Sequence, residues 1–89
     1  MTWVYINQLA EYEGKEVELR GWVYHRRSSG KIHFLVIRDG TGLCQCVIFQ
    51  PEVSPKVFEL ADHIPLESSV IVRGKVRADK RAPGGYELG

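Results

Sequence analysis

The sequence contains no long apolar run. None of its 89 residues belongs to a stretch approaching the roughly 20 consecutive apolar residues that a membrane-spanning helix needs. The amino terminus also lacks the basic segment followed by an apolar run that is typical of a secretory signal peptide. These absences argue against a membrane protein and against a secreted one, and they predict a cytoplasmic location.

Cysteine is scarce. Cys44 and Cys46 lie two positions apart in an extended run, so both side chains point to one face of a strand, where backbone geometry disfavours a mutual disulfide. No second pair of cysteines or histidines stands at the spacing of a tetrahedral zinc site, because His25, His33 and His63 are scattered. We therefore expect buried, unreactive thiols and neither a metal nor another cofactor in this chain.

Catalytic motifs and net charge are also lacking. The sequence has no glycine-rich phosphate loop and no nucleophile–base pair, which predicts that the chain is not an enzyme by itself. The formal net charge is only +1, unlike that of a strongly basic polyanion-binding protein. Charge is nevertheless segregated along the chain. Four glutamates lie between positions 11 and 18, and seven arginine, lysine or histidine residues lie between positions 20 and 38, so the second segment is locally basic.

The pattern of apolar residues predicts strands and one helix. Alternation of apolar and polar residues predicts strands over 16–27, 32–38, 43–49 and 69–78, and a further extended segment over 86–88. Ser54 and Pro55 predict the start of a helix that ends before Pro65, and Gly21 marks a bend or bulge within the first strand. Three strands, a helix and two strands predict a single all-β domain with one short helix over residues 1–89. This order favours a five-stranded Greek-key OB-fold barrel. An SH3-like barrel does not ordinarily have a helix between its third and fourth strands.

The fifth predicted strand is short. It has only four residues, from Tyr86 to Gly89, although strands usually run about five or six. We therefore predict a fifth strand truncated at the C-terminus, in a chain that is part of a longer protein. Because a closed barrel has no free edges, a clipped last strand predicts partial opening of the barrel or self-association through the first and fourth strands.

The segment from Gly30 to Phe49 contains the main candidate site. Alternation places Phe34 and Gln45 on the same, more polar face of the second and third strands, with Arg38 beside them. An aromatic ring can stack on a base, and an amide can read a base edge through one donor and one acceptor. Single-stranded RNA is recognised by this combination. Packing of Phe34 in the core is the alternative that the alternation leaves open.

Several short motifs together resemble one known family. They are Gly21-Trp22-Val23 with Arg26-Arg27, the run from Gly30 to Leu35, the run from Arg38 to Gly42, Gln45, the run from Val72 to Val76, and the run from Pro83 to Leu88. In this order and spacing they resemble the amino-terminal anticodon-binding domain of the class IIb aminoacyl-tRNA synthetases. The resemblance covers essentially the whole chain and is greatest to the asparaginyl type, followed by the aspartyl type.

The resemblance implies roles for individual residues. Phe34 would stack on the central anticodon base, a uridine in both Asn and Asp tRNAs, and Gln45 would hydrogen-bond to anticodon bases. Arg27 would contact the anticodon loop, Arg26 would contact phosphate or the loop less specifically, and Glu87 would lie near the first anticodon position. The partner would be the anticodon loop of a tRNA. ATP and Mg²⁺ would belong to a catalytic domain that is absent from this chain.

Physical chemistry agrees with these roles and leaves two alternatives. Arg26, Arg27 and Lys31 would gather backbone phosphates and make binding depend on salt, although a solvated basic face is the simpler reading. A general single-strand-binding OB domain would use the same stacking without preference for sequence. A protein-interaction OB domain would use sheet edges and apolar surface and would bind no nucleic acid.

Overall fold

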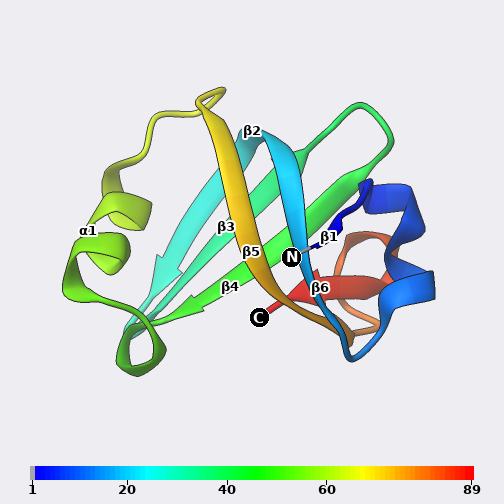
Figure 1. Ribbon diagram of the computed structural model, residues 1–89. Helices are drawn as coiled ribbons and strands as arrows, with labels where there is room; N and C mark the ends of the chain where they lie inside the picture. The colour runs from blue at the N-terminus through cyan, green and yellow to red at the C-terminus, as the bar shows by residue number, and fades with distance from the viewer. Residues whose placement is uncertain (1) are drawn as a thin grey trace.

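The computed structural model describes residues 2–89 and consists mainly of strands. In chain order the elements are β1 (Thr2–Trp3), a 3₁₀ helix (Ile6–Tyr12), β2 (Glu16–Ser29), β3 (Ile32–Arg38), β4 (Leu43–Phe49), a 3₁₀ turn (Gln50–Glu52), α1 (Pro55–His63), β5 (Ser69–Ala78), a 3₁₀ turn (Pro83–Gly85) and β6 (Tyr86–Leu88). Five of the strands form a barrel in the order β2, β3, β4, β6 and β5 (Figure 1). The short strand β1 is added outside the barrel, parallel to β2.

Strands β2 and β5 close the barrel. β2 has 14 residues and pairs with β5 through its first half and with β3 through its second half. Seven residue pairs join β2 to β5, from Glu16 opposite Lys75 to Trp22 opposite Ser69. The predicted five-stranded OB barrel is therefore confirmed. The predicted partial opening is wrong, because the first and fourth strands of the barrel are paired with each other.

β6 is short but has a partner strand on each side. Glu87 lies opposite Gln45 of the parallel strand β4 and opposite Arg77 of the antiparallel strand β5. The next residue, Gly89, exchanges two backbone hydrogen bonds with Lys75, with N···O distances of 2.9 and 3.3 Å. A strand of three residues is thus sufficient to link β4 to β5.

The two faces of β3 and β4 are as the alternation predicts. Five inward-facing residues are at most 5% exposed: His33, Leu35, Ile37, Cys44 and Cys46. The residues between them, including Phe34 and Gln45, are only partly buried. Phe34 therefore lies on the outer face, and the alternative of core packing does not hold.

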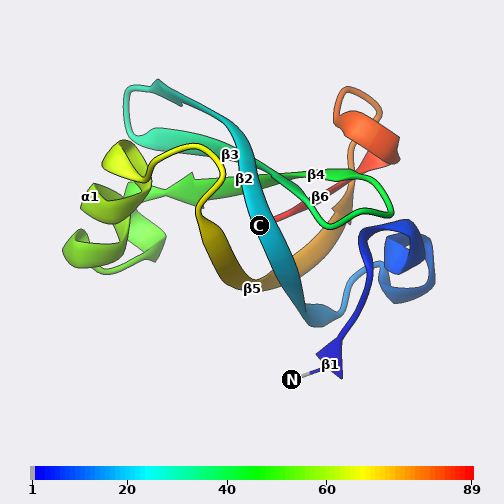
Figure 2. The same cartoon turned by 90° about the horizontal axis from the view of Figure 1, so that it is seen from above.

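Helix α1 covers one end of the barrel, and the 3₁₀ helix Ile6–Tyr12 lies at the other end (Figure 2). The helix begins as predicted, since the Ser54 hydroxyl accepts a hydrogen bond from the Val57 amide at 3.2 Å and Pro55 occupies the first turn. Its Phe58 ring stacks on the buried His33 ring with 3.9 Å between centroids. Among residues 2–89, no helix is long and apolar enough to cross a membrane.

Gly21 is required where β2 passes close to β3. A Cβ atom at this position would collide with the carbonyl oxygen of Arg38. The bulge lies further along β2, where the register with β3 shifts between Val23 and His25. The glycine predicted to mark a bend or bulge thus permits a close approach of two strands, and the bulge forms without it.

Candidate nucleic-acid interface

Phe34 and Arg27 form one end of the candidate site. They stand opposite each other on β3 and β2, and the Arg27 guanidinium carbon lies 4.0 Å from the centroid of the Phe34 ring. This is a cation–π contact, which holds an exposed positive charge beside the aromatic face. The structure therefore brings the predicted stacking residue together with one of the predicted basic residues.

Gln45, Glu87 and Arg77 form the other end. The Gln45 Nε2 atom donates to Glu87 Oε2 at 3.1 Å, and Arg77 Nη2 donates to Glu87 Oε1 at 3.0 Å. Glu87 is only 8% exposed, so these two bonds satisfy a carboxylate with little access to water. Because an ionised carboxylate only accepts hydrogen bonds, it orients the Gln45 amide with the NH₂ group towards β6.

Phe34 and Gln45 are diagonal neighbours on one face. Phe34 lies opposite Val47, and Gln45 lies opposite Val36, in the antiparallel pairing of β3 with β4. Diagonal neighbours in such a pair are about 7–8 Å apart, a separation that one nucleotide can span. One continuous surface therefore crosses all five strands of the barrel, and it contains the side chains of Arg27, Phe34, Gln45, Glu87 and Arg77.

Arg77 is the site residue that sequence reasoning missed. It lies on the outward-facing set of β5, and its guanidinium binds Glu87. The alternation over 69–78 places it on that face, but nothing local indicates which residue it meets. The signal that identifies Arg77 is the register of β6 against β5, which places Arg77 opposite Glu87.

Arg26 lies away from this surface. It stands opposite the inward-facing Leu35, and its guanidinium donates to the carbonyl oxygens of Ile64 at 2.9 Å and Asp62 at 3.1 Å. Those carbonyls belong to the C-terminal end of α1, where a cation is favourable. The structure thus assigns Arg26 a helix-capping contact and does not bring it together with Phe34.

Lys31 lies in the turn between β2 and β3 and is exposed. Its carbonyl oxygen accepts a hydrogen bond from the Gln50 amide at 2.8 Å, which fixes the backbone of the turn. The turn follows the end of β2 that carries Arg27. Lys31 can therefore extend the positive surface beyond the strands.

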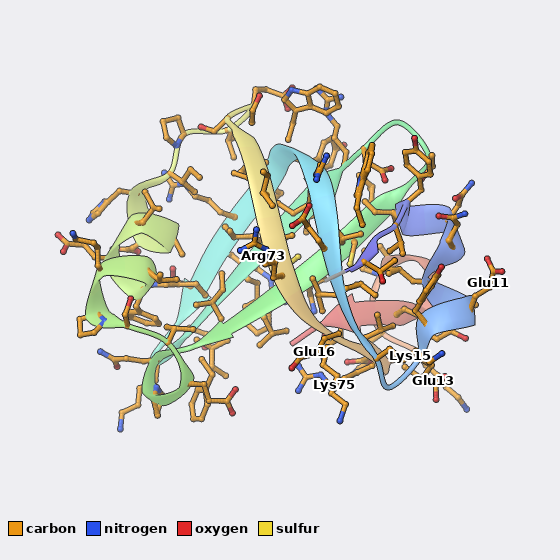
Figure 3. All side chains as sticks on the ribbon, viewed as in Figure 1. Glu11, Glu13, Lys15, Glu16, Arg73 and Lys75 are labelled. Atoms are coloured by element: carbon orange, nitrogen blue, oxygen red, sulfur yellow. The ribbon has the colours of Figure 1, made fainter. Side chains whose placement is uncertain are left out.

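The acidic N-terminal segment lies at the other end of the barrel. Glu11, Glu13 and Glu16 gather with Lys15 and Lys75 on the side away from α1 (Figure 3). The hairpin of β2 and β3, with its basic residues, ends beside α1 (Figure 1). Three of the four glutamates of the acidic segment therefore lie at the end of the barrel opposite the β2–β3 hairpin.

A second ion-pair cluster lies on the outer side of β2. The buried carboxylate of Glu18 accepts from Arg20 Nε at 2.7 Å and from Arg73 Nε at 3.0 Å. The hydrogen bond from Arg20, followed by that from Arg73, lowers the pKa of Glu18. Arg20 also lies 4.2 Å from the Trp3 ring, so this cluster attaches β1 to the barrel.

The structure places both cysteine thiols inside the barrel. Cys44 and Cys46 are free and buried on the inner face. The hydrogen bond with Cys44, together with burial, raises the pKa of Cys46 well above its usual value. Within residues 2–89 no group of three or more His, Cys, Asp or Glu residues could hold a metal ion.

Comparison with known proteins identifies the family. Residues 17–88 match the family model of the tRNA anti-codon type, described as an OB-fold nucleic acid binding domain. The chain belongs to this family. The domain is 58% identical over 89 residues to asparagine–tRNA ligase of Symbiobacterium thermophilum, with 100% of the chain and 20% of that ligase covered. It is 56% identical over 85 residues to the ligase of Thermus thermophilus, covering 96% of the chain and 19% of that ligase.

A solved structure agrees with this assignment. Asparaginyl-tRNA synthetase from Pyrococcus horikoshii superposes with a TM-score of 0.89 at 49% identity, covering 96% of the OB-fold domain and 20% of that chain. The predicted resemblance to the asparaginyl type is confirmed. The domain spans about a fifth of the length of these ligases, and the part that it matches is a nucleic-acid-binding domain.

Proposed function

We propose that this domain binds the anticodon loop of an asparagine tRNA on the surface formed by Arg27, Phe34, Gln45, Glu87 and Arg77. The observation that supports the proposal most is the continuity of this surface: a ring for stacking and an oriented amide lie on neighbouring strands, beside guanidinium groups. The domain also closely resembles proteins named asparagine–tRNA ligase.

Phe34 supplies affinity. Stacking of one base on an aromatic side chain contributes about 1–3 kcal/mol and tolerates any base. The Arg27 guanidinium lies over the ring, 4.0 Å from its centroid, so a base that stacks on this face would displace it, and the displaced guanidinium could then bind a neighbouring phosphate. Phe34 accordingly strengthens binding without selecting among bases.

Gln45 supplies selection. Its NH₂ group donates to Glu87, so its carbonyl oxygen is available to a ligand as an acceptor. The N3–H group of uridine is a donor and matches that oxygen, whereas N3 of cytidine is an acceptor and opposes it. A matched contact of this kind discriminates by about 1–3 kcal/mol, which corresponds to a preference of roughly fivefold to 150-fold for uridine.

The basic residues supply salt-dependent attraction. Arg27 and Lys31 lie on or next to the proposed surface and would bind phosphates of the loop. Arg26 donates to two helix carbonyls, so any phosphate contact by Arg26 would compete with those bonds. We expect the contribution of Arg26 to RNA binding to be smaller than that of Arg27.

The proposal extends to the longer protein that the relatives represent. In such a ligase, ATP and Mg²⁺ would serve a catalytic domain outside these 89 residues, and the complete protein would attach asparagine to its tRNA in the cytoplasm. Self-association of the domain stays a prediction. Sedimentation over a range of concentrations tests it, and a strict monomer would count against it.

Binding of anticodon stem-loops tests the proposed function. An Asn-type loop is compared with loops altered at each anticodon base, at one moderate salt concentration, for the unaltered domain and for Phe34→Ala and Gln45→Ala. We expect preference for the central uridine, weaker binding with Phe34→Ala, and loss of the preference with Gln45→Ala. Phe34→Leu is the matched control for folding, since it keeps an apolar side chain and removes only the flat ring.

Two results would contradict the proposal. Equal binding to every loop would make the domain a general single-strand binder. Absence of salt-sensitive RNA binding, in a domain that melts cooperatively, would favour a protein partner.

A further inference from the structure

The second half of β2 has a partner strand on one side only. Its pairing with β5 ends at Trp22 opposite Ser69. Within residues 2–89, the segment His25–Ser29 pairs with β3 and with no other strand. A strand edge of this kind opens more readily than a strand that is paired on both sides. Arg27, which belongs to the proposed RNA surface, lies on this edge.

Helix α1 holds this edge through side chains of β2. Arg26 donates from Nε to the carbonyl oxygen of Ile64 at 2.9 Å and from Nη1 to that of Asp62 at 3.1 Å. Carbonyl groups at the C-terminal end of a helix lack intrahelical partners, and the rigid guanidinium can donate to two of them at once. The hydroxyl of Ser28 donates to the Asp62 carboxylate at 3.4 Å. The edge is therefore attached to the end of α1, which lies beside the β2–β3 hairpin (Figure 1).

The contact continues to β3. The Nδ1 atom of His33 lies 2.6 Å from the Ser28 hydroxyl oxygen, and the His33 ring stacks on the Phe58 ring of α1 with 3.9 Å between centroids. Since the single hydroxyl proton of Ser28 goes to Asp62, the hydroxyl oxygen accepts from His33 Nδ1–H. One helix thus holds both strands of the hairpin. Five residues form this contact, which we call the α1 clasp: Arg26, Ser28, His33, Phe58 and Asp62.

The α1 clasp borders Arg27 on both sides along the chain. Arg26 and Ser28 direct their side chains to α1, whereas Arg27 between them lies over the ring of Phe34 on the opposite face. The backbone of Arg27 is therefore fixed from the side of the helix, while its side chain stays on the proposed RNA surface.

On the basis of the proposed function, we infer that Arg26 is a positioning residue for RNA binding. Through the α1 clasp it holds Arg27 beside Phe34, where the guanidinium can bind a phosphate once a base occupies the ring. Arg26 raises the affinity for RNA without touching it. Helix α1, which has no residue on the proposed surface, thereby contributes to RNA binding.

A double-mutant cycle tests the inference. The affinity for the Asn-type stem-loop is measured for Arg26→Ala and for Ser28→Ala, each in the unaltered domain and in Arg27→Ala. With Arg27 present, each substitution is expected to lower the affinity by about twofold to fivefold. Ser28→Ala leaves the charge unchanged, so it should have no further effect in Arg27→Ala, and the loss caused by Arg26→Ala should be smaller there. Ser69→Ala on β5, outside the clasp and the proposed surface, is the matched control.

Hydrogen exchange tests the clasp without RNA. The backbone amides of residues 25–29 are expected to exchange about tenfold faster in Arg26→Ala and Ser28→Ala than in the unaltered domain, and at an unchanged rate in Ser69→Ala. Binding and exchange are both measured well below the melting temperatures of all variants, so that global unfolding does not contribute.

Three results would overturn the inference: no loss of affinity with Arg27 present, the same loss with and without Arg27, or unchanged exchange of these amides. Absence of stem-loop binding by the unaltered domain would instead overturn the proposed function. The exchange measurement would still test the α1 clasp in that case.

Discussion

Replacement of Glu87 by glutamine tests the orientation of Gln45. In the unaltered domain the carboxylate accepts from Gln45 Nε2 at 3.1 Å and from Arg77 at 3.0 Å, so only one orientation of the Gln45 amide is favourable. Glu87→Gln keeps the shape of the side chain but can present either an oxygen or an NH₂ group to Gln45. Both orientations of the Gln45 amide then become accessible.

The magnitude follows from the bond that is changed. A hydrogen bond to a charged group contributes about 1.5–3 kcal/mol, and a bond between neutral groups about 0.5–1.5 kcal/mol. The preference for one amide orientation therefore falls by roughly 1 kcal/mol or more. We expect the ratio of affinities for central uridine and central cytidine to fall about fivefold to tenfold in Glu87→Gln.

The assay is titration of two stem-loops that differ only at the central anticodon base. Glu59→Gln, on the exposed side of α1, is the matched control because it makes the same change of charge away from the proposed surface. An unchanged uridine-to-cytidine ratio in Glu87→Gln, with normal thermal unfolding, would refute the argument that Glu87 orients Gln45. An equal change of the uridine-to-cytidine ratio in both variants would show that net charge alone is responsible.

Other parts of the structure lead to further predictions. Gly21→Ala brings a methyl group against a carbonyl of β3 and is expected to lower the free energy of unfolding by about 1–3 kcal/mol. A denaturant titration measures this change, and an unchanged midpoint would contradict the close approach of β2 to β3 at Gly21. The pKa of Glu18 is lowered by Arg20 and Arg73, so its stabilising contribution is present above the unfolded-state pKa and is lost as pH falls through the lowered folded-state value. Melting temperatures below about pH 4.5 should therefore fall less steeply in Glu18→Gln than in the unaltered domain. Arg27→Ala should reduce the slope of log K against log salt for stem-loop binding by about 0.7, and an unchanged slope would remove Arg27 from the phosphate contacts.

Local patterns account for the features that were predicted correctly. Alternation placed Phe34 and Gln45 on the outer face, and the Ser54-Pro55 pair marked the start of α1. Side-chain direction in a strand and the first turn of a helix depend on neighbouring residues, so a short window of sequence contains the information.

Other features depend on pairings that no short window contains. Arg26 and Arg27 are adjacent and equally basic, but one binds helix carbonyls and the other covers Phe34. Both arginines follow the bulge between Val23 and His25, which shifts the register of β2 against β3. The pairing with β3 after this bulge decides which face of the strand each arginine occupies. The sequence alone does not give this register, so both arginines were predicted to contact RNA.

The sequence by itself determined the types of the elements, their order and the faces of β3 and β4, because local periodicity and capping specify these. Only the tertiary structure decided that the barrel closes, that Glu87 orients Gln45 and that Arg77 joins them. These outcomes depend on the register of β6 against β4 and β5, which brings residues 42 positions apart into one hydrogen bond. Such a register is selected by packing of the whole barrel.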